Sequence, residues 1–146
     1  MMKKIRQATI GALVATPLSL GLALAGPAQA TAATALPRCT DWSQHTYANG
    51  NHYIYPSTWH QSKNADCTLR PGDANPGVFV LQDTLNRCYG AKLTLDAIYG
   101  PKTREAVLKV QVRHKISQDG IYGPETAGAM DWPLRSPDGK TVGCYT

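Results

Sequence analysis

The apolar positions in the second half of the chain recur at the spacing of an amphipathic helix. After Pro76 they fall on one face, at Val78, Leu81, Leu85, Cys88 and Tyr89. Asp83 and Arg87 point away from this face, and Gly90 stands where a glycine commonly ends a helix. The pattern predicts a first helix over residues 76–89.

A second helix is predicted to begin near Pro101, because the first N–H of a helix has no partner that a proline could remove. Its main face carries Thr103, Ala106, Val107, Val110 and His114. Leu108 and Val112 form a separate apolar stripe, which we expect to receive the N-terminal part of the chain. A third, shorter helix is predicted from about Pro124 to Met130.

The pattern in the first half of the chain is different. Residues 31–75 are rich in polar side chains and in aromatic rings, at Trp42, Tyr47, Tyr53, Tyr55 and Trp59. Asn49-Gly50 predicts a hairpin or a tight turn, and Tyr53–Pro56 one short strand. We expect the rest of this extension to be irregular. Its rings either pack on Leu108 and Val112 or form a second sugar-contacting surface, and we favour packing.

The first thirty residues have the pattern of an export signal. Lys3, Lys4 and Arg6 precede an apolar stretch, and Ala28-Gln29-Ala30 supplies the small residues that signal peptidase requires. Proline, polar residues and glycines interrupt the stretch, so it is a poor membrane anchor. We therefore expect residues 1–30 to be cleaved, and a secreted protein, extracellular or associated with the cell wall, without membrane attachment.

Loss of the signal changes the charge of the chain. The precursor has 15 Lys and Arg against 10 Asp and Glu. Three of the basic residues leave with the signal, so 12 remain against 10 and the net charge falls to about +2. The sequence has no basic run or nucleic-acid-binding motif, and we expect no nucleic-acid partner.

Four cysteines lie after the signal, at Cys39, Cys67, Cys88 and Cys144. An even number in a small exported chain indicates two disulfides, for which three pairings are possible. Their wide separation argues against a zinc site. We favour Cys39–Cys67 with Cys88–Cys144, since this pairing joins near neighbours and ties the C-terminal tail, residues 134–146, back to the first helix.

The chain contains an internal repeat. The segment Asp96-Ala97-Ile98-Tyr99-Gly100-Pro101-Lys102-Thr103 recurs 23 residues later as Asp119-Gly120-Ile121-Tyr122-Gly123-Pro124-Glu125-Thr126, with six of eight positions identical. Such a duplication indicates one loop-to-helix unit used twice. Asp can close a turn, Ile can enter the core and Pro can start a helix, so the unit has a structural explanation.

These residues resemble the bacterial peptidoglycan-binding domain family of three-helix modules, from about Arg70 to Met130. The doubled unit carries the resemblance, together with Val80-Leu81-Gln82-Asp83-Thr84-Leu85-Asn86, Cys88-Tyr89-Gly90, Ala106-Val107 and Val110-Gln111. The cysteine form is similar to a subset found in small exported wall proteins. Ala97 and Val110 depart from the family, which usually has Gly and Phe at these positions.

The resemblance implies an all-α three-helix module that binds peptidoglycan non-covalently. We expect residues 1–30 to be the signal, 31–75 an N-terminal extension, 76–133 the peptidoglycan-binding domain and 134–146 a C-terminal tail. We expect a monomer that needs no cofactor or metal and is not an enzyme, since neither H-E-x-x-H nor G-x-S-x-G occurs. The alternatives are a secreted protein-interaction module, such as an inhibitor or adaptor of a cell-wall enzyme, and a small cell-wall hydrolase.

The candidate ligand-binding residues come from the repeat and the second helix: Tyr99, Tyr122, Asp96, Asp119, Lys102, Arg104, Lys109 and Arg113. The tyrosines offer a ring face and a hydroxyl to a sugar or stem peptide, or they fill the core. The basic residues can meet stem-peptide carboxylates, or they form a solvated helix face. The two aspartates invite a glycosidase interpretation, but equivalent members of a repeat lack the unequal environments that such carboxylates need.

Overall fold

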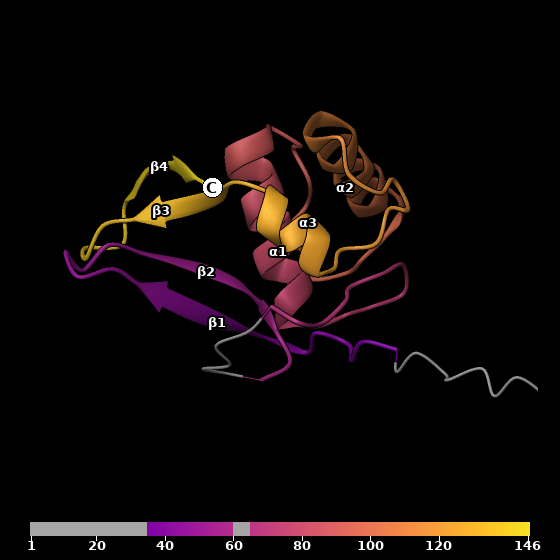
Figure 1. Ribbon diagram of the computed structural model, residues 1–146, viewed down its shortest axis with the longest axis horizontal. Coiled ribbons are helices and arrows are strands. Elements are labelled where there is room, and N and C mark those ends of the chain that lie inside the picture. Colours follow the sequence, from indigo (N-terminus) through magenta and orange to yellow (C-terminus); the bar gives the residue numbers. More distant parts are fainter. Residues whose placement is uncertain (1–34, 60–64) are drawn as a thin grey trace, which may run out of the picture. The chain divides into compact units, whose positions relative to one another are not determined.

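The computed structural model describes residues 35–59 and 65–146, and the predicted signal peptide lies outside them. In chain order the elements are β1 (Asp41–Thr46), β2 (His52–Ser57), α1 (Pro76–Tyr89), α2 (Pro101–His114), α3 (Pro124–Ala129), β3 (Trp132–Arg135) and β4 (Thr141–Tyr145). The three helices group together, and the strands extend from them as two hairpins (Figure 1).

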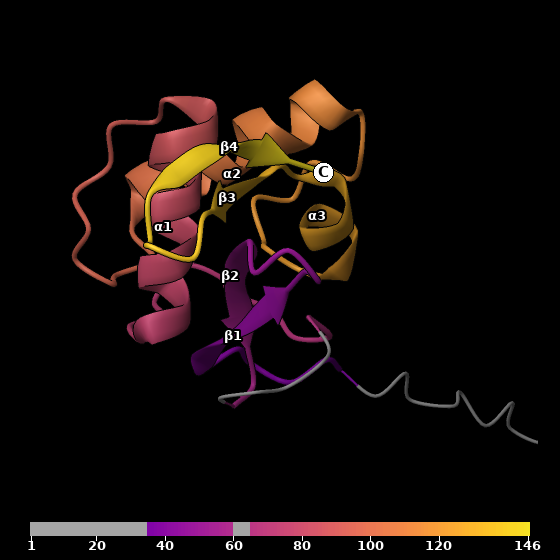
Figure 2. The ribbon, with the colours of Figure 1, turned by 90° about the vertical axis from the view of Figure 1, so that its left-hand side faces the viewer.

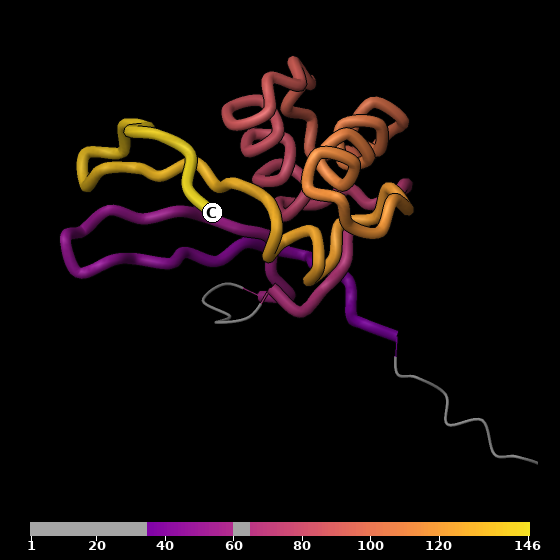
Figure 3. Tube along the Cα trace, turned by 45° about the horizontal axis from the view of Figure 1, so that its top comes forward, coloured from indigo at the N-terminus to yellow at the C-terminus, as the bar shows by residue number. Residues whose placement is uncertain are grey.

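The prediction of an all-α fold is wrong, because the described residues include a four-stranded antiparallel sheet in the order β1-β2-β3-β4. The two hairpins lie next to each other (Figure 3), and one residue pair, His52 with Arg135, joins β2 to β3. Strands β1 and β2 lie in the extension that was expected to be mostly irregular, and β3 and β4 lie near the C-terminal tail, where no strand was predicted. Between β3 and β4 the tight turn Ser136–Lys140 brings the chain back, since the Ser136 N–H donates to the Lys140 carbonyl at 2.9 Å.

The predicted N-terminal hairpin is confirmed. Tyr47 N–H donates to the Asn51 carbonyl at 2.8 Å, and Gly50 adopts a φ of +81° that a side chain would disfavour. The hairpin approaches α1 closely at Gly77, where an added Cβ would lie 2.8 Å from the Asp41 carbonyl oxygen. The hairpin is therefore packed directly on the first helix.

The three helices begin where the sequence predicts, and α1 ends before the predicted glycine. Asn75 caps α1 by accepting from the Val78 N–H at 3.2 Å, and Gly90 follows the last residue in the left-handed conformation. Pro101 and Pro124 occupy the first positions of α2 and α3. Capping residues and prolines affect helix ends through residues close to them in sequence, so these boundaries can be predicted from the sequence alone.

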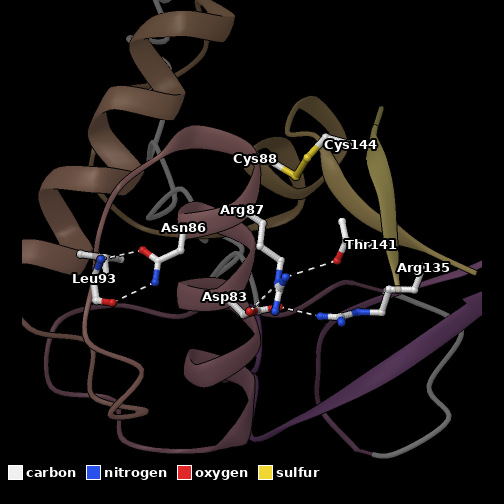
Figure 4. Close-up of polar contacts among 8 residues, drawn as sticks. All are labelled: Asp83, Asn86, Arg87, Cys88, Leu93, Arg135, Thr141 and Cys144. Carbon is white, nitrogen blue, oxygen red and sulfur yellow. Dashed lines mark hydrogen bonds and ion pairs between the residues drawn. A yellow bond between two sulfur atoms is a disulfide. The ribbon is translucent and has the colours of Figure 1, made fainter. Parts of the chain in front are cut away.

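Asp83 was expected to face solvent, but it is buried with 7% of its surface exposed. Its carboxylate forms ion pairs with Arg87, at 2.7 Å, and with Arg135, also at 2.7 Å (Figure 4). Arg135 belongs to β3, which packs on α1 (Figure 2). The second hairpin thus covers a helix face that helical periodicity alone assigns to solvent.

The core lies among the helices and the inner side of the sheet. Its largest fully buried side chains include Leu69, Leu81, Leu85, Tyr99, Tyr122 and Met130. The expectation that the aromatic extension packs on Leu108 and Val112 is wrong, since Val112 is 54% exposed. The rings of Tyr53 and Tyr55 pack on Trp132 instead, with the Tyr53 ring centre 6.2 Å from that of Trp132, because the hairpin pairs with β3.

Both favoured disulfides are confirmed. Cys39 is bonded to Cys67, 28 residues along the chain, and Cys88 to Cys144, 56 residues along. The first bond lies in the core. The second fixes β4 to the end of α1 (Figure 4).

Candidate functional site

Each copy of the repeat forms a turn before a helix, at residues 96–98 before α2 and at residues 119–121 before α3. A buried glutamine closes each of these two turns, which are called the glutamine corners below. The Gln82 amide, on α1, donates to Asp96 Oδ1 at 2.8 Å, and its oxygen accepts from the Ala97 N–H at 3.0 Å. It also donates to the Ile98 carbonyl and to Thr103 Oγ1, at 3.0 and 3.2 Å. One side chain therefore satisfies four groups of the loop that starts α2.

Gln111, on α2, repeats this arrangement at the loop that starts α3. Its amide donates to Asp119 Oδ1 at 2.9 Å, and its oxygen accepts from the Gly120 N–H at 2.9 Å. The Ile121 carbonyl and Thr126 Oγ1 complete the set, at 3.0 and 3.1 Å. Both glutamines are 1% exposed, so each network stabilises a corner from inside.

The two predicted aspartates belong to these networks. The hydrogen bond from Gln82 holds the pKa of the Asp96 carboxyl below its usual value, with a further contribution from the Ile98 N–H. Asp119 likewise accepts from the N–H two residues ahead, on Ile121, at 2.8 Å. Each carboxylate therefore has a structural task in its own turn, and the two are not brought together at one site.

The predicted tyrosines lie in the core rather than at the surface. Tyr99 is 1% exposed and donates its hydroxyl hydrogen to the Gly120 carbonyl at 3.0 Å. Tyr122 is 0% exposed and its ring packs edge-on against Trp132. This burial favours the core-filling interpretation that the sequence left open.

The turn residues of the two corners share a left-handed backbone, with φ +60° at Ala97 and +69° at Gly120. An added Cβ at Gly120 would lie 2.8 Å from Arg104 Cγ, so the flexible Arg104 side chain would have to move. The second corner is therefore covered by a side chain of α2. Ala97 can replace glycine in the first corner at the modest cost of a left-handed alanine.

The four predicted basic residues separate into two pairs. Arg104 donates to the Asp119 carbonyl at 3.2 Å, and the Arg113 guanidinium lies 5.3 Å from the centre of the Tyr89 ring. These two arginines support the fold. Lys102 and Lys109 instead line a surface groove of about 460 Å³.

This groove, called the lysine groove below, lies between α2 and the loop that follows α1. Its lining includes Tyr89, Lys92, Leu93, Lys102, Glu105 and Lys109. Glu105 pairs with Lys109 at 2.8 Å, so three ammonium groups face one carboxylate. Lys92 was not among the predicted site residues, because nothing local in the sequence indicates that the loop carrying it folds against α2. The groove is a surface suited to an anionic ligand.

Two other properties of the described residues bear on function. None of the helices within residues 35–59 and 65–146 has the length and apolar character that a membrane span needs. In the same part of the chain, no group of three or more His, Cys, Asp or Glu side chains is placed to hold a metal ion.

Residues 74–130 match the protein family described as "Putative peptidoglycan binding domain". The matched segment runs from just before the cap of α1 to the end of α3, so it contains both glutamine corners and all the lining residues of the lysine groove. Neither hairpin is included. The three-helix part of the chain is therefore similar to this family of domains.

Two solved structures are similar to parts of the chain. An endolysin of Burkholderia phage AP3 is 49% identical over 40% of this chain and 22% of its own, with a TM-score of 0.39. A peptidoglycan-binding protein from Clostridioides difficile, in complex with glutamine hydroxamate, is 26% identical over 55% of this chain and 49% of its own, with a TM-score of 0.44. The chain therefore spans less than half of either protein. No curated protein gives a significant match.

Proposed function

We propose that this protein binds peptidoglycan non-covalently and does not cleave it. The observation that carries the proposal is the family match over residues 74–130, which contain both glutamine corners. The first of these corners sets the path of the chain into α2, which carries two of the three lysines of the lysine groove. Binding at this groove needs no group beyond the side chains that line it.

The ligand that fits the lysine groove is the stem peptide of peptidoglycan, whose free carboxylates carry its charge. Lys92, Lys102 and Lys109 can each donate a charge-assisted hydrogen bond to a carboxylate. Exposed ion pairs are individually weak, about 1 kcal/mol or less, so useful affinity requires several at once. Three lysines in one open groove can form several such ion pairs at once with a polymer that carries many carboxylates, such as the cell wall.

The absence of cleavage is part of the proposal and has its own support. A glycosidase needs two carboxylates in unequal environments, one of them kept protonated. Asp96 and Asp119 occupy equivalent turns, and each accepts a hydrogen bond from a buried glutamine amide. Both are better suited to holding a turn than to transferring a proton.

Export is the second part of the proposal. The signal pattern of residues 1–30 and the two disulfides support secretion, since disulfides persist in oxidising compartments. N-terminal sequencing of the protein from culture medium should begin at Thr31. A retained N-terminus on a membrane-bound protein would contradict export by cleavage.

The test of binding is sedimentation of the protein, without residues 1–30, with purified insoluble sacculi. We expect the wild type to pellet, and the charge reversal Lys102→Glu with Lys109→Glu to lower the bound fraction by about tenfold through repulsion of carboxylates. Lys140→Glu is the matched control, because this exposed lysine lies in the turn between β3 and β4. Wild-type protein that stays in the supernatant at moderate salt would disprove the proposal.

The same sacculi also report on cleavage. After prolonged incubation with the wild-type protein, the supernatant should contain no more soluble muropeptides than a buffer control, as measured by chromatography. Time-dependent release of muropeptides by the purified protein would show a hydrolase instead.

A further inference from the structure

A second groove lies between the N-terminal hairpin and α1, on a surface that the family match only partly includes. It has a volume of about 660 Å³ and a mainly apolar lining. Trp42 and Ile54 contribute from the hairpin, and Phe79, 43% exposed, contributes from α1. Trp42 and Ile54 share one face of the hairpin, since Trp42 lies two residues from Gln44, the partner of Ile54.

One charged group, Asp96, stands at the edge of this apolar groove. Its Oδ1 is fixed by the Gln82 amide and the Ile98 N–H, at 2.8 and 2.9 Å. Among the described residues, no residue other than Asp96 itself donates a hydrogen bond to its other oxygen. The residue is exposed, so this oxygen is a positioned acceptor beside an aromatic surface. Apolar faces with a few placed polar groups are the usual composition of a small-molecule site.

The apolar groove and the lysine groove share lining residues with a third hollow. This hollow has a volume of about 370 Å³, and its lining includes Asp96, Ile98 and Lys102. Asp96 also lines the apolar groove, and Lys102 also lines the lysine groove. The three hollows therefore adjoin one another around the loop before α2, with an apolar end and a basic end.

We propose that the apolar groove binds a pyranose ring of the glycan strand while the lysine groove holds the stem peptide attached to it. The proposal rests on the proposed function and specifies its ligand as a muropeptide, sugar and peptide together. The C–H face of a pyranose packs on Trp42 and Phe79, and a sugar hydroxyl donates to Asp96. The basic end receives the peptide carboxylates. The apolar and basic surfaces therefore follow each other in the same order as the sugar and the peptide of the ligand.

The test is calorimetric titration with three soluble probes. These are the N-acetylglucosaminyl-N-acetylmuramyl disaccharide, the free stem tetrapeptide and the disaccharide–tetrapeptide. We expect the wild type to bind the third probe most tightly. Phe79→Ala and Asp96→Asn should each weaken that binding by about five- to tenfold and leave binding of the free tetrapeptide unchanged.

Matched controls come from the same chain. Val142→Ala removes an apolar side chain from β4 that is 56% exposed, against 43% for Phe79. Asp119→Asn changes the equivalent carboxylate of the second corner, which lines neither groove. Both should bind the disaccharide–tetrapeptide as the wild type does. Circular dichroism of every variant checks that the fold is kept.

The outcomes separate the two proposals. If the wild type pellets with sacculi but Phe79→Ala and Asp96→Asn bind the disaccharide–tetrapeptide normally, the glycan site is wrong and peptidoglycan binding stands. Equal wild-type affinity for the free tetrapeptide and the disaccharide–tetrapeptide would also overturn the glycan site. Failure of the wild type to pellet overturns the proposed function itself.

Discussion

At the scale of single residues, two tyrosines from equivalent positions of the repeat have different hydrogen bonding. The Tyr99 hydroxyl donates to the Gly120 carbonyl. The Tyr122 hydroxyl is buried and has no hydrogen-bond partner among the described residues. Burial raises the pKa of both phenols, so both remain protonated donors at neutral pH. Only one of them uses that donor.

The two tyrosines therefore predict opposite effects of the same substitution. Tyr99→Phe should lower the free energy of unfolding by about 1–2 kcal/mol, because it leaves the buried Gly120 carbonyl unpaired. Tyr122→Phe should leave stability unchanged or raise it, since it removes a buried unsatisfied hydroxyl. Urea denaturation of the two variants and the wild type measures the difference. Equal destabilisation by both changes would contradict the assigned hydrogen bonds.

Asp96 predicts a pH-dependent contribution to stability. Gln82 lowers the pKa of its carboxyl below the ordinary value of 3.8, so the folded state favours the ionised form. This contribution is present above pH 3.8 and is lost as the pH falls through the lower, folded-state pKa. The stability difference between wild type and Asp96→Asn, from urea curves at several pH values, should shrink in acid. A difference that stays constant down to strong acid would exclude the linkage.

At the scale of elements, the glutamine of each corner joins one helix to the start of the next. Gln111→Leu should keep the volume but leave the Gly120 N–H and the Asp119 carboxylate without their partner. We expect a loss on the order of 3 kcal/mol in the free energy of unfolding. Gln44→Leu, on the exposed side of β1, is the control and should change stability by less than about 0.5 kcal/mol. Thermal and chemical denaturation of both variants measure the effect.

The helices were predictable from the sequence because their signals are local. Pro76, Pro101 and Pro124 mark their starts, and Gly90 marks one end. The second hairpin was missed because its strands of four and five residues are too short to show a period, and they depend on pairing with each other. The turn residues 136–139 were the signal that could have indicated it.

The candidate site was predictable to the same extent. Lys102 and Lys109 are seven residues apart and share one side of α2, which helical spacing reveals. Lys92 could not be assigned to the same groove, because its loop reaches α2 only through the fold. The burial of Tyr99 was open for the same reason, since loop position alone does not tell a ligand contact from a core residue.

At the scale of the whole molecule, the two disulfides hold segments that are far apart in sequence. Cys88→Ser with Cys144→Ser opens the larger loop, and the chain-entropy account predicts a loss of roughly 4 kcal/mol in stability. Amide hydrogen exchange should quicken in β3 and β4 and change little in α2, which packs elsewhere. Fast exchange spread evenly over the molecule would show that the bond supports the whole core instead.

Each glutamine corner joins a helix to a turn that comes later in the chain, and this order affects how the chain can fold. The Gln82 oxygen accepts from the backbone N–H 15 residues later in the chain, and the Gln111 oxygen from the one 9 residues later. Each helix therefore fixes the turn that follows it. Assembly can thus proceed from α1 toward α3 through short loops, each closed at little entropic cost. The bond between Cys144 and Cys88 spans 56 residues and can form only after Cys144 has become available. In a chain that becomes available from its N-terminus onward, these contacts can form in the same order as their residues appear.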